Sequence, residues 1–224
     1  MPKKVRNIEI KLGMTYEGWK EIGKNRYELV GKEYVAGYMT GEEMANITNA
    51  NLHSKYDMNK VELRVLNSDG GSWIKRLLVT KEIYQADSYH LKEKIATHVR
   101  DTEDSEILKS MFYKKEYSKM IEYVEALKYK YDGEVEEVEK LNELQRYLNK
   151  RKETMKRYKD YDGVKQKLKA YSKKTGLKYR NMGCQESNNY CRLTRRMKKK
   201  RMSWSKNGSE NIAKVITMYA SESC

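Results

Sequence analysis

Two stretches, VELRVLNSDGG at residues 61–71 and IYQADSYHLKEKIATHV at residues 83–99, set the class of fold. Each opens with a short apolar run that is typical of a strand and stops at polar residues. The first run ends at Asp69-Gly70-Gly71, and the second ends at Asp87, after which a helix is predicted. With a short helix predicted around Trp73, the order strand, helix, strand, helix favours parallel pairing. We therefore expect an α/β fold whose ligands collect at the carboxyl ends of these strands.

Antiparallel strands are predicted before these two stretches. Residues 8–16 alternate apolar and polar side chains, which predicts a half-buried strand. Residues 17–25 predict a turn. Residues 27–38 predict one or two further extended pieces, broken at Gly31, so that the segment forms an antiparallel meander.

Helices are predicted on both sides of the parallel strands. Thr40, followed three residues later by Glu43, is the capping-box signature of a helix that runs to about Lys55. From residue 101 to residue 175 the apolar residues recur with helical periodicity, and the two Asp-Gly pairs of this segment are natural breaks. The segment is therefore predicted to be an all-helical insertion of two to four helices.

The end of the chain predicts a return to the sheet at 176–179, followed by helices. Ser203 or Ser205 is expected to cap the last helix. That helix is predicted to turn four apolar side chains toward the core: Ile212, Val215, Ile216 and Tyr219. The chain then divides into three predicted segments: residues 1–100 form the N-terminal part of a core, residues 101–175 the helical insertion, and residues 176–224 the helices that complete the core.

Charge is spread unevenly along the sequence. The 224 residues hold 47 Lys plus Arg and 32 Asp plus Glu, a net charge of +15. Residues 101–145 hold 7 basic and 13 acidic side chains, whereas residues 146–201 hold 21 basic and 4 acidic ones, a net charge of +17. The alternative is a solvated helix face, but this concentration favours a polyanion such as nucleic acid, bound with a steep salt dependence.

Composition excludes several classes of protein. No window approaches the roughly 18 apolar residues that a membrane-spanning helix needs, and 19 Tyr with regular aliphatic residues argue against disorder. The three cysteines are too few for a disulfide framework and no apolar signal segment opens the chain, so a cytoplasmic protein without a membrane partner is expected. Because His53 and His98 have no ligand-spaced partners, a zinc site is not expected.

Two acidic residues stand out as candidates for metal chemistry. Asp69 ends a predicted strand and is followed by two glycines, so a cation could approach the backbone there. An ordinary Asp-Gly turn is the alternative. Glu186 is the only acidic residue between Asp162 and Glu210, in a stretch with 15 Lys and Arg. It either makes a structural ion pair or coordinates a cation beside bound phosphate.

Asp87 and His90 form a D-x-x-H pair at a junction of strand and helix, where one can orient the other. A histidine at a helix start is otherwise a satisfied polar group. No Walker loop, dinucleotide fingerprint, H-E-x-x-H or nucleophile elbow is present, so nucleotide and serine-hydrolase chemistries have no support. The densest basic stretch supplies the residues expected to face DNA: Arg192, Arg195, Arg196, Lys198, Lys199, Lys200, Arg201 and Trp204.

Several blocks together resemble the ISLre-type insertion-sequence transposases of bacteria, which are DDE transposases with a ribonuclease-H-like core. The resemblance spans nearly the whole chain, in order. Its blocks are Tyr16–Trp19, Ser68–Lys75, Asp87–Lys92, Gly183–Ser187, Arg196–Met197 and Met202–Gly208.

The resemblance implies DNA strand cleavage and strand transfer at the ends of a mobile element. In this chemistry three carboxylates hold two divalent ions, normally Mg²⁺, about 3.5 to 4 Å apart. Asp69 would be the second acid and Glu186 the third, with Asp87 and His90 as a pair between them. The helices of residues 101–175 would be the insertion that separates the second and third acids. The implied partners are element-end and target DNA, a second copy of the chain when active, and a full-length transposase.

One departure from the family pattern concerns the first catalytic Asp, which precedes the Glu-Gly-Trp block in the family. No Asp precedes Asp57 here, and Glu9 is a poor substitute. The family's N-terminal DNA-recognition region is also unmatched. We therefore expect an incomplete ribonuclease-H-like mixed sheet without its first strand, in a truncated fragment that does not transfer strands alone. The alternatives are a non-catalytic nucleic-acid-binding protein and the aggregation-prone product of a decaying gene.

Overall fold

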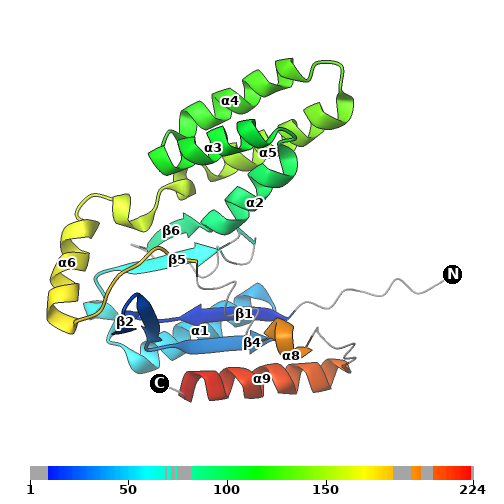
Figure 1. Cartoon of the computed structure of the whole chain (residues 1–224). Helices are drawn as coiled ribbons and strands as arrows, with labels where there is room; N and C mark the ends of the chain where they lie inside the picture. Colours follow the sequence, from blue (N-terminus) through cyan, green and yellow to red (C-terminus); the bar gives the residue numbers. More distant parts are fainter. Residues whose placement is uncertain are drawn as a thin grey trace. The chain divides into compact units, whose positions relative to one another are not determined.

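The computed structural model describes residues 10–68, 70–71, 74, 82–183, 193–197 and 204–222. These residues form a mixed α/β structure with small two-stranded sheets, which confirms the α/β class (Figure 1). The ribonuclease-H-like architecture stays a prediction. The chain forms two compact units. Unit 1 is built from the chain up to Arg64, residues 71–81 and the chain from Lys165 onward; unit 2 is built from Val65–Gly70 and Glu82–Val164. These boundaries differ from those of the three predicted segments.

Unit 1 begins with four antiparallel strands. Strand β1, Lys11–Thr15, pairs with β4, Glu33–Gly37, and strand β2, Gly18–Gly23, pairs with β3, Arg26–Val30. The predicted break of the extended pieces at Gly31, which has a φ of 66°, is confirmed.

The predicted turn over residues 17–25 is wrong for most of its length, because β2 occupies it. Trp19 explains the difference. Its backbone pairs with Leu29 on one side and exchanges two hydrogen bonds with Lys178, of 3.0 and 2.7 Å, on the other. A strand with partners on both sides is stabilised by contacts that the local sequence does not contain. The same bridge confirms that the chain returns to the sheet at Gly176–Tyr179.

Helix α1, Gly41–Lys55, begins and ends where the sequence predicts. The Thr40 hydroxyl accepts a hydrogen bond from the Glu43 N–H at 3.1 Å, and the Glu43 carboxylate accepts one from the Thr40 N–H at 2.7 Å. The predicted capping box is therefore confirmed. A 3-10 helix, η1 at Met58–Lys60, follows α1.

Helix α9, Lys206–Glu222, lies along β4 (Figure 1). Ser205 caps it as predicted, since its hydroxyl accepts from the Gly208 N–H at 3.1 Å. The predicted orientation is wrong for Val215 and Tyr219, which are 44% and 63% exposed. Small residues occupy the buried face instead, because a helix held close to a strand has no room there for large side chains. These residues are Ser209, Ala213, Thr217 and Ala220. The short helix α8, Arg195–Met197, contributes Met197 to the same cluster.

Unit 2 opens with a pair of strands whose carboxyl ends meet. Strand β5, Arg64–Ser68, pairs with β6, Glu82–Ala86. The Asp87 N–H, which follows β6, donates to the Ser68 carbonyl at 2.7 Å. The last residues of both strands therefore lie side by side, as parallel pairing requires.

Five helices and two 3-10 turns complete the chain between β6 and the return to the sheet. They are α2 at Ser88–His98, α3 at Thr102–Lys114, α4 at Tyr117–Lys130, α5 at Val135–Arg151, η3 at Glu153–Met155, η4 at Tyr158–Asp160 and α6 at Val164–Thr175. The predicted helices and both breaks at Asp-Gly pairs are confirmed. None of the helices among the described residues has the length and apolarity needed to cross a membrane.

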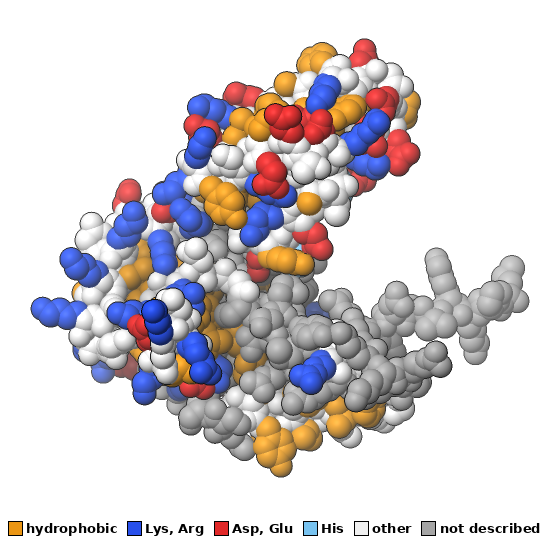
Figure 2. Space-filling model, viewed as in Figure 1, with side chains coloured by type: hydrophobic (Ala, Val, Ile, Leu, Met, Phe, Trp, Pro, Cys, Tyr) orange, Lys and Arg blue, Asp and Glu red, His pale blue; other side chains and the backbone are white. Residues whose placement is uncertain are grey.

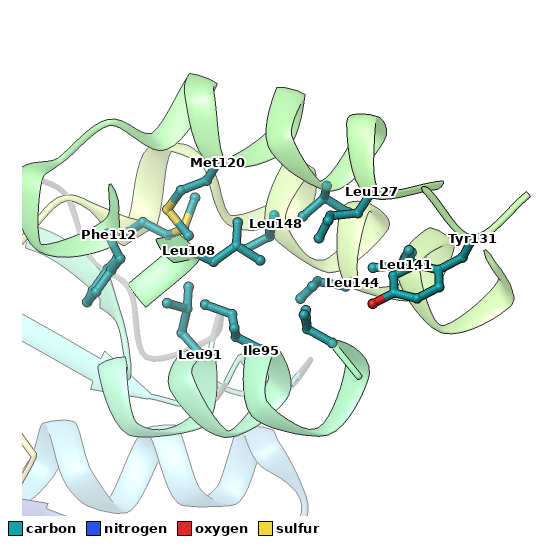
Figure 3. Packing of buried hydrophobic residues seen from close by; sticks show 13 residues of the cluster. Leu91, Ile95, Leu108, Phe112, Met120, Leu127, Tyr131, Leu141, Leu144 and Leu148 are labelled. Carbon is teal, nitrogen blue, oxygen red and sulfur yellow. The ribbon is translucent and has the colours of Figure 1, made fainter. Parts of the chain in front are cut away.

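The core of unit 2 is helical. Helix α2 supplies Leu91 and Ile95, which pack against Leu108 of α3, Met120 of α4 and Leu144 of α5 (Figure 3). All five side chains are almost completely buried. Because each helix places its apolar stripe on this one cluster, α2 belongs to the same packed body as the three helices that follow it.

Candidate functional site

The carboxyl ends of β5 and β6 are the site where the sequence places its first candidate acids. Asp69 and Glu186 are the two predicted metal ligands and are also predicted catalytic residues. Both lie outside the described residues. Ser68, Gly70 and Asp87 are described, and the hydrogen bond between the Asp87 N–H and the Ser68 carbonyl holds the two strand ends together. The described part of the site therefore consists of Asp87 and of Ser68 and Gly70, which flank Asp69 in the sequence.

Asp87 has a structural role at the joined ends of β5 and β6. Its side chain is buried, with 4% exposure for the residue. One carboxylate oxygen accepts from the Tyr89 N–H at 2.8 Å and so caps helix α2, while the other accepts from the Asn67 amide at 3.1 Å. Both oxygens therefore have protein donors, and the predicted catalytic role of Asp87 stays a prediction.

Asp87 is the end of a buried chain of side-chain amides. Asn67, whose amide group donates to Asp87, accepts at its Oδ1 atom from the Gln85 amide at 3.1 Å. Gln85 in turn accepts at Oε1 from the backbone N–H of Tyr158, 2.8 Å away in η4. Each member uses the neighbour's complementary group, so the network orients all three side chains.

The turn after β5 is held by a second set of contacts. The Ser68 hydroxyl lies 3.0 Å from the Tyr84 hydroxyl and accepts from the Gly70 N–H at 3.1 Å. Gly70 has a φ of 93°, and a Cβ atom added there would meet the guanidinium of Arg151, which lies over the Tyr147 ring at 3.9 Å. Glycine thus permits both the turn and the approach of a cation to it.

Arg151 is the residue of this site that the sequence does not reveal. It is separated from Gly70 by 81 positions and belongs to the end of α5. Its one local signal is that it lies near the start of the basic stretch of residues 146–201, and that signal does not distinguish it from the lysines around it.

The predicted partner of His90 is Asp87, and the structure shows His90 in contact with Glu93 and Tyr89. Its Nδ1 atom lies 3.3 Å from a carboxylate oxygen of Glu93, and its ring meets the Tyr89 ring edge-on at 5.5 Å. The Asp87 carboxylate accepts hydrogen bonds from Tyr89 and Asn67. The expectation that Asp87 and His90 orient each other stays a prediction.

The expected metal ligands, Asp69 and Glu186, both lie outside the described residues. Among them, no three His, Cys, Asp or Glu side chains gather as metal ligands would. Because Asp69 and Glu186 lie outside this set, the expected Mg²⁺ stays a prediction.

The predicted DNA-facing residues are described in part. Arg195 is exposed on α8, and Trp204 is 41% exposed with its indole N–H donating to the Met197 carbonyl at 3.2 Å. The remaining six positions have no described side chain: Arg192, Arg196, Lys198, Lys199, Lys200 and Arg201.

Comparison with known proteins gives one match. Residues 3–223 match the model of a family described as an uncharacterised protein family, UPF0236. No curated protein and no solved structure matches the chain.

Proposed function

Because the chain belongs to the uncharacterised protein family UPF0236, we propose from its own residues that it is a transposase-like protein that acts on DNA. The observation that carries this proposal is the meeting of β5 and β6. The hydrogen bond from the Asp87 N–H to the Ser68 carbonyl joins the carboxyl ends of the two strands, and Ser68 is the residue that precedes Asp69 in the sequence. Such ends are where α/β proteins place the groups that contact ligands.

The chemistry proposed for this place is metal-assisted transfer of DNA phosphoryl groups. Asp69 and Glu186 would hold the divalent ions, which supply a Lewis acid and an activated oxygen nucleophile when bound. The residues around Asp69 keep its neighbours fixed: Ser68 bonds to Tyr84 and to the Gly70 N–H, and Arg151 lies against Gly70. The Arg151 guanidinium, which lies against Gly70, would also attract a DNA phosphate.

A second candidate function is nucleic-acid binding without strand cleavage. It is favoured by the hydrogen bonds of Asp87, because both of its carboxylate oxygens are already used by Tyr89 and Asn67. Binding would then rest on the net charge of +17 between residues 146 and 201.

Direct binding of Mn²⁺ to the purified full chain separates the two functions. Titration calorimetry with wild type, Asp69→Ala and Glu186→Ala should show a site whose affinity falls at least tenfold in each variant, because each loses a ligand. Asp132→Ala, an exposed aspartate in a turn, is the matched control and should bind like wild type. Nicking of plasmid DNA in Mg²⁺ is followed in parallel.

The two possible outcomes support different functions. A shared loss of Mn²⁺ affinity in both variants supports the transposase-like site. DNA binding that is unchanged by EDTA and by both substitutions, with no metal site in wild type, supports plain nucleic-acid binding.

A further inference from the structure

Helix α6 is twelve residues long and contains five lysines but no acidic residue. All five side chains are exposed, and no ion pair joins any of them to a described acidic side chain. They are Lys165, Lys167, Lys169, Lys173 and Lys174.

Other lysines of the protein are neutralised on their own helix. Lys109, Lys119 and Lys128 each form an ion pair with a glutamate three residues earlier, at 2.8, 2.9 and 2.8 Å. Such pairs are the ordinary arrangement of a solvated helix face. The lysines of α6 lack that arrangement, so their charge is available to an external anion.

The spacing of three of these lysines gives a line of positive charge. Lys165, Lys169 and Lys173 follow each other at four-residue intervals, so they lie on one side of the helix over about 12 Å. Leu168 is buried on another side of α6 and fixes which side faces outward.

The helix is anchored at its last turns. The Tyr171 hydroxyl hydrogen-bonds to the Glu62 carboxylate, and burial together with this bond raises the pKa of Tyr171 to about 12. The Thr175 hydroxyl accepts from the N–H of Leu177, which is buried, and the next residue, Lys178, pairs with Trp19. The lysines are therefore presented on a fixed support.

The positive surface continues past the helix. Lys178 is exposed, and the guanidinium of Arg180 lies 4.1 Å from the centre of the Tyr27 ring. Figure 2 shows Lys and Arg side chains gathered on the side of the molecule where α6 lies. We define the α6 surface as Lys165, Lys167, Lys169, Lys173, Lys174, Lys178 and Arg180.

The side chains of the α6 surface are suited to contact the phosphate groups of a nucleic acid rather than its bases. Lysine ammonium groups are point charges that contact phosphates, and they carry no pattern that distinguishes one base pair from another. The aromatic ring of α6, Tyr171, bonds inward to Glu62 and offers no base-stacking platform.

We propose that the α6 surface binds the phosphate backbone of double-stranded DNA without reading its sequence. This rests on the proposed function only for the choice of DNA as the polyanion. It places an anchoring site within the basic stretch of residues 146–201 but outside the predicted DNA-facing residues at 192–204, and the site needs no metal.

The test compares two triple variants of the full chain with equal loss of charge. The first replaces Lys165, Lys169 and Lys173 with Gln. The control replaces Lys109, Lys119 and Lys128 with Gln, which removes lysines that are already paired. Binding to two labelled duplexes of equal length and unrelated sequence is measured by fluorescence anisotropy over a salt series, with EDTA throughout.

The expected result is a change in the slope of log Kobs against log salt. Each lost phosphate contact removes about 0.9 from the slope, so the α6 variant should lose about 2.7, equally on both duplexes. The control should keep the wild-type slope. Far-UV circular dichroism checks the fold, which Gln supports as well as Lys does in a helix.

Three results would overturn the proposal: a wild-type slope in the α6 variant, an equal change in the control, or a loss confined to one duplex. Vesicles with phosphatidylserine are titrated as well, and binding to vesicles but not to duplexes would assign the surface to a membrane instead. Asp69→Ala is run in the same series. Its Mn²⁺ affinity tests the transposase-like function separately, since its salt slope should equal that of wild type.

Discussion

The side-chain carbonyl of Gln85 accepts a hydrogen bond of 2.8 Å from the backbone N–H of Tyr158, 73 residues further along the chain. Gln85 is buried in β6, and its amide group donates to Asn67, which in turn donates to Asp87. One amide side chain thus ties η4, which follows the helices of unit 2, to the joined ends of β5 and β6.

Replacement of Gln85 by Ala should lower the free energy of unfolding of unit 2 by about 1–3 kcal/mol, because the Tyr158 N–H loses its partner in a buried place. Unfolding in urea is followed by far-UV circular dichroism, since unit 2 is mainly helical and contains no Trp. Gln145→Ala is the control. Gln145 bonds to the exposed Glu125, so its loss should cost under about 0.5 kcal/mol, and equal effects would contradict the buried role of Gln85.

Gly70→Ala should cost stability through the backbone and disturb Arg151. Gly133→Ala is a matched control, since its φ of 89° is close to the 93° of Gly70 but no atom lies within 4 Å of an added Cβ. Both variants should lose roughly 1–3 kcal/mol from the left-handed backbone. Gly70→Ala alone should also weaken Mn²⁺ binding, because it displaces the turn beside Asp69. Equal Mn²⁺ affinity in both variants would show that this turn does not shape the site.

The helical core of unit 2 should depend strongly on Leu144, which is fully buried. Leu144→Ala removes packed methyl groups and leaves a cavity, so the free energy of unfolding should fall by about 2–5 kcal/mol. Val135→Ala, at an exposed apolar position of the same helix, should change it by less than about 0.5 kcal/mol. Urea midpoints that shift alike in the two variants would contradict the packing in Figure 3.

Asp160 should give unit 2 a specific sensitivity to acid. Burial by itself would raise the pKa of Asp160, but hydrogen bonds from Lys115 at 2.7 Å and Arg157 at 3.1 Å outweigh it and lower the pKa below its usual 3.8. The charged carboxylate therefore stabilises the folded state above pH 3.8, and this contribution is lost as the pH falls below that value.

Asp160→Asn should accordingly be less stable than wild type at neutral pH, and the difference should shrink below about pH 4. Urea unfolding at a series of pH values measures it, with Asp132→Asn as an exposed control. A difference between Asp160→Asn and wild type that is constant over the whole series would contradict the lowered pKa.

The close approach of α9 to β4 predicts that its buried face tolerates no larger side chain. Ala213 is fully buried against this strand, so Ala213→Leu should destabilise unit 1 by about 1–3 kcal/mol through overpacking. Val215→Leu, on the exposed face, should be neutral. Fluorescence of Trp19 and Trp204 during urea unfolding reports on unit 1, and a neutral Ala213→Leu would show that the helix can move away from the strand.

The sequence by itself determined the elements whose causes are local. The Thr40 and Glu43 side chains that define the capping box lie three positions apart, so the start of α1 can be read directly from the sequence. Strands β5 and β6 and the Asp-Gly breaks between helices were predictable for the same reason. The excess of positive charge between residues 146 and 201 could also be read from the sequence.

Only the tertiary structure decided the features that depend on distant partners. Trp19 lies in β2, which pairs with β3, and it gains a second backbone partner, Lys178, from the far end of the chain. Helix α9 buries Ala213 rather than Val215 because β4 lies too close for larger side chains. Arg151 reaches Gly70 only through the packing of α5. Local patterns record which residues prefer helix or strand, whereas the choice among competing faces and partners depends on contacts between segments far apart in sequence.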